Sequence, residues 1–146
     1  MSVPHLSGLY RLVANGKKLT DGRLFVLTFK ESRNRQLIIQ LNQEFQLELG
    51  ELADDTVLPF YSEVSQTVYG KPNTRWTLKD TGEFYESFKI TTLNNTGFTI
   101  YADTEKEDKD LADYGAVLGL SYENLARLQD EVIPTMRKYL LEILLK

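Results

Sequence analysis

Turn signals divide the first two thirds of the chain into short apolar runs. Asn-Gly and Asp-Gly pairs stand at residues 15–16 and 21–22, and further turn-forming residues stand at 81–82 and 94–97. Because Asn, Asp and Gly tolerate the positive φ angles of tight turns, such residues between apolar runs are typical of β-hairpins. The pattern predicts about eight short strands at spacings of about 8–12 residues, as in an antiparallel sandwich or barrel.

Two of these runs are apolar on both faces. Residues 24–29 and 37–39 carry apolar side chains at odd and even positions alike, whereas residues 45–49 alternate apolar with polar side chains. Alternation indicates a strand with one solvated face, and a run that is apolar on both faces needs cover on both. We therefore expect a second element to pack on the outer face of the sheet.

The last third changes from short runs to a helical period. Residues 103–120 form an acidic connector with six acids and two lysines. From Ser121, a preferred N-cap residue, apolar residues recur at steps of three and four. Pro134 lies inside this pattern, and we expect a kink there because proline removes one backbone hydrogen bond. The pattern predicts a long kinked helix over residues 121–146 that covers a sheet formed by residues 1–102.

The final turns of this helix are apolar nearly all round. Leu141 and Leu145 lie off the stripe that would face the sheet. A helix that is buried on one side only does not need these residues. Two alternatives stay open: the helix end inserts deep into its own core, or it binds a protein partner, most simply a second copy of the chain. The candidate partner-binding residues are Tyr139, Leu141, Leu144 and Leu145.

The chain has no cysteine, and His5 is its only histidine. The absence of cysteine excludes disulfides, thiolate zinc sites, iron–sulfur clusters and cysteine nucleophiles. Any Ser-His-Asp triad would have to use His5, whose position near the end of the chain is poor for a catalytic base. We expect no catalytic residues, no metal and no cofactor, and therefore a protein that is not an enzyme.

Charge and hydropathy narrow the range of partners. Lys and Arg total 17 against 21 Asp and Glu, which gives a net charge of −4. This balance offers no electrostatic reason to bind nucleic acid. No apolar stretch approaches the roughly 18 residues that a membrane-spanning helix needs. The first residues lack the basic and apolar regions of a secretory signal, so we expect a cytoplasmic location.

Aromatic residues make up 11% of the chain. An aromatic-lined cavity binds small apolar molecules, but a filled core uses the same residues, and both alternatives stay open. Glu86 shares its strand parity with Phe84 and Phe88, so it is the carboxylate to examine for burial in the interior. The candidate ligand-binding residues are Tyr10, Phe25, Phe29, Trp76, Phe84, Glu86, Phe88 and Phe98.

The beginning of the chain resembles the first strand of lipocalin-like small β-barrels of the calycin or META type. Residues 6–13 read Leu-Ser-Gly-Leu-Tyr-Arg-Leu-Val, where that family commonly reads Leu-x-Gly-x-Trp-x-Leu-Val, and Asn-Gly-Lys follows at 15–17. Residues 88–100 also resemble a late barrel hairpin. The resemblance covers residues 6–30 and 84–102, and it implies a meandering antiparallel barrel with an apolar ligand inside it.

The sequence therefore predicts a single α+β domain over residues 1–146. Its expected architecture is a curved antiparallel β-sheet or small up-and-down barrel of about eight strands, covered by the long kinked C-terminal helix. One expected function is a non-catalytic binding module that takes a small apolar ligand in the barrel interior. The alternative is an acidic protein-interaction module (an immunity-type inhibitor, a chaperone or a component of an oligomeric assembly) that uses the apolar C-terminal helix.

Overall fold

Helices form most of the structure. The computed structural model describes residues 13–16, 21–79, 81–94 and 97–145. The longest described helices are α2 (Asp21–Lys30), α3 (Ser32–Gln43) and α6 (Tyr122–Leu145). The shorter helical segments are η1 (Leu47–Leu49), α4 (Glu63–Val68), α5 (Glu83–Glu86) and η2 (Leu111–Tyr114). The described strands are β1 (Lys89–Asn94) and β2 (Gly97–Tyr101).

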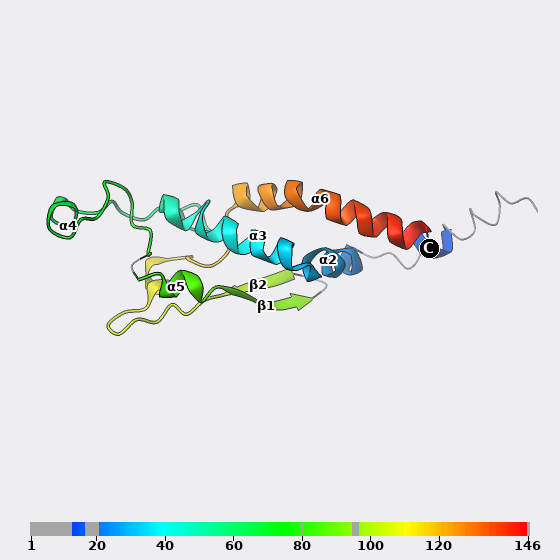
Figure 1. Ribbon diagram of the computed structural model, residues 1–146, viewed down its shortest axis with the longest axis horizontal. Coiled ribbons are helices and arrows are strands. Elements are labelled where there is room, and N and C mark those ends of the chain that lie inside the picture. The colour runs from blue at the N-terminus through cyan, green and yellow to red at the C-terminus, as the bar shows by residue number, and fades with distance from the viewer. Residues whose placement is uncertain (1–12, 17–20, 80, 95–96, 146) are drawn as a thin grey trace, which may run out of the picture.

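These elements pack in three layers. In Figure 1, α2 and α3 lie between α6 on one side and the β1–β2 hairpin on the other, and both middle helices contact α6 and β1. The core between the layers includes Phe29 of α2, Ile38 of α3, Ile100 of β2 and Leu128 of α6, all of them buried. No helix in the described part of the chain has the length and apolar character to cross a membrane.

The prediction of an eight-stranded sheet or up-and-down barrel is wrong. The described residues contain one open sheet of two antiparallel strands, and the apolar runs at 24–29 and 37–41 lie in α2 and α3. A short run that is apolar at every position fits a central helix as well as a buried strand. Both runs are apolar on two sides because α2 and α3 form the middle layer. The barrel implied by the lipocalin-like resemblance is therefore absent from the described residues.

The other predicted strands fail for local reasons. Residues 8–12 lie outside the described residues, and residues 13–16, which include the predicted Asn-Gly turn, are helical. Residues 67–69 fall at the end of α4, and residues 75–79 are irregular apart from an isolated bridge at Arg75. An isolated bridge is not a strand, because the residues beside it do not continue the pairing.

Residues 45–49 form a tight turn and η1 instead of an alternating strand. Leu47 is fully buried, whereas Phe45 and Leu49 are exposed. The chain then reverses at Gly50, whose φ of 73° lies in the left-handed region that glycine adopts readily. A Cβ atom at Gly50 would lie 2.3 Å from the Cβ atom of Arg75. This close approach fixes glycine at the point where the chain turns back after η1.

Two predicted elements are confirmed. Strands β1 and β2 pair antiparallel on either side of the predicted turn residues at 94–97, with Ile90 opposite Ile100. The strand predicted through Phe84, Glu86 and Phe88 begins only at Lys89, because residues 83–86 form α5. The helical period that begins after Ser121 forms α6, and the Ser121 hydroxyl accepts a hydrogen bond from the Asn124 N–H at 3.4 Å. Pro134 lies inside α6, and the helix changes direction partway along its length in Figure 1.

Two buried amide side chains hold the segment that leads into α6. Asn42 donates to the Val117 carbonyl at 3.1 Å and accepts from the Gly119 N–H at 2.9 Å. Gln46 donates to the Gly119 carbonyl at 2.8 Å and accepts from the Ser121 N–H at 2.9 Å. Each amide pairs with this segment as a neighbouring strand would. The two side chains therefore set where α6 begins relative to α3.

Glu31, between α2 and α3, connects the middle layer to the C-terminal half of α6. Its carboxylate accepts hydrogen bonds from the Tyr139 phenol at 2.7 Å and the Lys138 ammonium at 3.2 Å. The Tyr139 hydrogen bond first, and then Lys138, hold the pKa of Glu31 below its ordinary value. A carboxyl whose pKa is lowered by folding stabilises the fold above its ordinary pKa, and this contribution is lost as the pH falls.

We expect Glu31→Gln to reduce the dependence of stability on acidic pH. At neutral pH the variant should melt at a lower temperature, because a neutral amide cannot replace the carboxylate. Between about pH 5 and pH 3 its melting temperature should fall less than that of the native chain. Thermal melts in this range test the expectation, with Glu44→Gln at the exposed end of α3 as the control. An equal acid-induced loss in the native and Glu31→Gln chains would contradict it.

Candidate functional site

The aromatic residues predicted to line a cavity lie in separate groups. Phe25 and Phe29 of α2 pack with Phe98 of β2, with ring centroids 4.7, 5.7 and 6.4 Å apart. Trp76 instead meets the ring edge of Tyr114 at 5.4 Å. These contacts join one layer to the next, so the rings serve as packing between elements. They do not surround one common space.

The other predicted ligand-binding residues belong to α5 and the start of β1. Phe84 and Phe88 are buried and pack edge to face at 5.1 Å. Glu86 stands between them in the sequence. Its side chain is exposed, because on the α5 helix it does not share a side with Phe84. Tyr10 lies outside the described residues. The structure thus brings Phe84 and Phe88 together but separates them from Glu86. These residues cannot line a barrel interior, because the described residues form no barrel.

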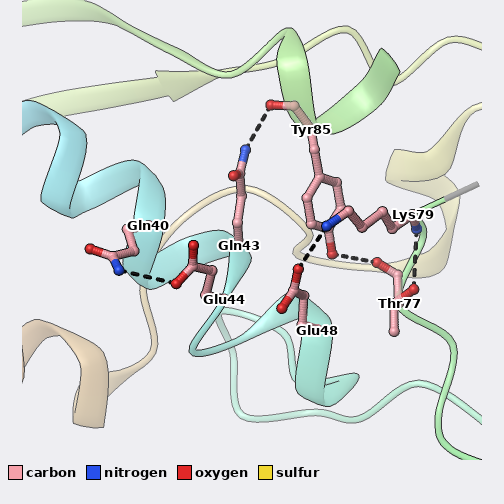
Figure 2. A network of polar contacts seen from close by, with 7 residues as sticks. All are labelled: Gln40, Gln43, Glu44, Glu48, Thr77, Lys79 and Tyr85. Atoms are coloured by element: carbon pink, nitrogen blue, oxygen red, sulfur yellow. Dashed lines mark hydrogen bonds and ion pairs between the residues drawn. The ribbon is translucent and has the colours of Figure 1, made fainter. Parts of the chain in front are cut away.

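An open depression of about 530 Å³ lies beside α3 and α5, next to the polar network of Figure 2. Gln43 donates to the Tyr85 carbonyl at 2.7 Å, and the Tyr85 hydroxyl donates to the Thr77 carbonyl at 2.7 Å. Lys79 pairs with Glu48 at 3.0 Å and lies over the Tyr85 ring. Burial raises the pKa of the Tyr85 phenol. These groups satisfy one another, and they hold Tyr85 against α3 and Lys79 against η1.

A second depression, of about 350 Å³, is acidic. It is lined by Glu83, Asp103, Glu105, Lys106 and Glu107. Within the described ranges, no three His, Cys, Asp or Glu side chains are grouped so that they could hold a metal ion. Runs of like charge are usually solvated faces of a protein. We assign this depression no chemistry.

The four predicted partner-binding residues of α6 divide into two pairs. Tyr139 and Leu144 are half-buried, since Tyr139 bonds Glu31 and Leu144 lies 3.8 Å from the position that a Cβ atom on Gly16 would take. Leu141 and Leu145 are 49% and 60% exposed. The off-stripe leucines therefore do not insert into the described core. About half or more of each side chain lies at the surface.

Sequence reasoning missed two further apolar residues on the exposed side of α6. Tyr122 is 83% exposed and Ile133 is 44% exposed, and Leu125 is also exposed. Tyr122, Ile133 and Leu144 are spaced eleven residues apart. Eleven residues make about three helical turns, so these side chains lie along one line. This spacing is the signal that could have found them.

A second exposed apolar surface lies on the segment 59–76, which contains α4. Val64 and Val68 of α4 are 62% and 68% exposed, and Phe60 and Tyr69 are exposed beside them. No residue of α4 is buried. Figure 1 places α4 and the C-terminal end of α6 at opposite ends of the molecule. The two surfaces can therefore be altered independently of each other.

No protein-family model, no curated protein and no solved structure matches this chain significantly. The function must therefore be argued from the surfaces themselves. The polar groups around the larger depression are engaged in holding the fold. The exposed apolar side chains, above all those of α6, are the features that the fold itself does not use.

Proposed function

We propose that this chain is a non-catalytic protein-interaction module that associates through the exposed side of α6. The observation that carries the proposal is the exposure of Tyr122, Ile133, Leu141 and Leu145 on a single helix. The opposite side of α6 already packs on α2 and α3. A helix with one face in its own core has no folding use for further apolar residues. Larger exposed apolar patches mark interaction sites.

Of the roles expected from the sequence, a component of an oligomeric assembly is the one that these residues support best. Exposed aliphatic and aromatic side chains, spread along a helix of about 36 Å, suit another helix better than a small ligand. Most soluble oligomers are built from identical copies. A second copy of the chain supplies such a helix without any further partner.

We expect the mass of the native chain to rise with concentration above the 16.8 kDa of one copy. Replacing both Leu141 and Leu145 by Glu should weaken this association by at least about tenfold. Full burial of a leucine side chain contributes about 1.5–3 kcal/mol, and the charged side chains that replace the leucines resist burial. Sedimentation equilibrium over a range of concentrations measures both chains. A native chain that stays at the mass of one copy throughout would overturn the proposal.

The matched control replaces Val64 and Val68 by Glu. This variant carries the same charge change at two aliphatic positions of another helix that are more exposed than Leu141 and Leu145. Its association should equal that of the native chain, because α4 lies at the other end of the molecule. If this control loses the association and the α6 variant keeps it, the interaction surface is α4 and the proposal is wrong.

A further inference from the structure

We infer that the partner is a second copy of this chain, and that two α6 helices pair antiparallel about a two-fold axis at Ile133. The inference rests on the proposed function of α6 as an interaction surface. It adds the direction of the second helix and the register between the two. Each of these follows from the order of residues along the exposed side of α6.

The apolar residues on this side are arranged symmetrically about Ile133. We define the outer face of α6 by five residues, which stand eleven and seven positions before Ile133, at Ile133, and seven and eleven positions after it. Seven and eleven residues are about two and three helical turns, so all five lie in one row. The outer face consists of Tyr122, Ala126, Ile133, Leu140 and Leu144, each exposed or half-buried.

An antiparallel pair centred on Ile133 matches this row with itself. Tyr122 then meets the partner's Leu144, Ala126 meets the partner's Leu140, and Ile133 meets its own copy on the axis. Such mutual pairing, in which two positions exchange roles between copies, is the signature of a two-fold interface. The large Tyr122 ring contacts an aliphatic side chain, and the small Ala126 leaves room for Leu140. The sizes are therefore complementary along the whole row.

Most of the outer face does not compete with the packing of the chain on itself, although Leu144 at its end already lies beside Gly16. Leu128 and Val132, the most buried apolar residues of α6, lie on the side that contacts α2 and α3. Neither belongs to the row centred on Ile133. A second copy can therefore approach the outer face while the core of each copy stays intact.

The charges beside Ile133 select the antiparallel direction. Asp130 stands three residues before Ile133, and Arg137 stands four residues after it. Neither makes an ion pair with another residue in the part of the chain that the structure describes. In an antiparallel pair each Asp130 lies next to the partner's Arg137. In a parallel pair in register, Asp130 and the partner's Arg137 stand seven residues, about 10 Å, apart along the helices, so this attraction is lost.

The absence of cysteine provides a direct test of the register. We expect a chain with Ile133→Cys to form a disulfide-linked dimer on mild oxidation, because residues on the axis of closely packed helices come within disulfide reach. A chain with Tyr122→Cys, on the same face and more exposed, should stay unlinked. In the antiparallel pair its copy lies about 33 Å away along the helix. Non-reducing gels of both chains, at concentrations where the native chain associates, give the result.

Each outcome decides a specific point. Linkage of the Ile133→Cys chain alone supports the antiparallel pair. Linkage of Tyr122→Cys as efficiently as Ile133→Cys indicates a parallel or random approach and overturns the inference. If Ile133→Cys stays unlinked while Leu141→Glu with Leu145→Glu still abolishes association, the register is wrong and the proposed function stands. If the native chain never exceeds the mass of one copy, the proposed function itself fails.

Discussion

Replacing Gln46 by Leu should lower the free energy of unfolding by about 3 kcal/mol, because each buried polar group that loses its partner costs about 1–3 kcal/mol. Gln46 is fully buried, and its amide bonds the Gly119 carbonyl, the Ser121 N–H and the side chain of Asn124. Leucine has a similar size but cannot bond the Gly119 carbonyl and the Ser121 N–H, whereas the Asn124 amide keeps its bond to the Phe45 carbonyl. The start of α6 should become the weakest point of the fold.

Urea unfolding measures this loss from the shift in midpoint at constant slope. The control is Gln40→Leu in α3, where the exposed amide donates to Glu44 at 3.0 Å. Gln40→Leu should change the free energy of unfolding by no more than about 0.5 kcal/mol, as substitutions at exposed positions usually do. Equal stability of the Gln46→Leu and Gln40→Leu chains would show that the buried amide does not hold the segment before α6.

Reversing one charge beside Ile133 should raise the dissociation constant of the dimer roughly 30-fold. Asp130→Arg converts two attractive contacts, one on each side of the axis, into two repulsive ones. Arg137→Asp also makes both contacts repulsive, with two negative charges instead of two positive ones at each. An exposed ion pair contributes about 0.2–1 kcal/mol, so reversing two of them changes the association by about 2 kcal/mol.

Both positions are exposed, and neither contributes an ion pair within the described residues. The melting temperature of each single chain, measured at low concentration, should therefore match that of the native chain. Loss of association with no loss of folding separates an interface effect from a defect of the fold. A native dissociation constant in either variant would contradict the predicted pairing of Asp130 with Arg137.

The long helix and the hairpin could be predicted because their signals are sustained. The period of three and four residues runs through all of α6, and the turn residues at 94–97 stand between two apolar runs that pair as strands. The runs at 24–29 and 37–41 are too short for periodicity to separate a central helix from a buried strand. Both runs are covered on two sides, as expected. The reason is that α2 and α3 form the middle layer of the structure, and not that the runs are buried strands.

The candidate site was only partly visible in the sequence. Leu141 and Leu145 stood out because they left the buried stripe of a sustained helical pattern. Ile133 did not, since its importance depends on which side of α6 packs on α2 and α3. The sequence pattern placed Asn42 in a turn between strands and Gln46 on the solvated face of a strand over residues 45–49. Hydropathy cannot show that a buried amide replaces a backbone partner.

The most direct test of the account is the mass of an equimolar mixture of Asp130→Arg and Arg137→Asp chains at sedimentation equilibrium. Each chain alone should stay close to the 16.8 kDa of one copy at a concentration where the native chain is a dimer. In the mixture, the arginine introduced into one chain meets the aspartate introduced into the other. The unchanged Arg137 of the first chain and the unchanged Asp130 of the second meet on the far side of the axis, so the mixture should regain twice the mass of one copy. A mixture that stays at the mass of one copy while the native chain forms dimers would contradict the antiparallel pairing of α6.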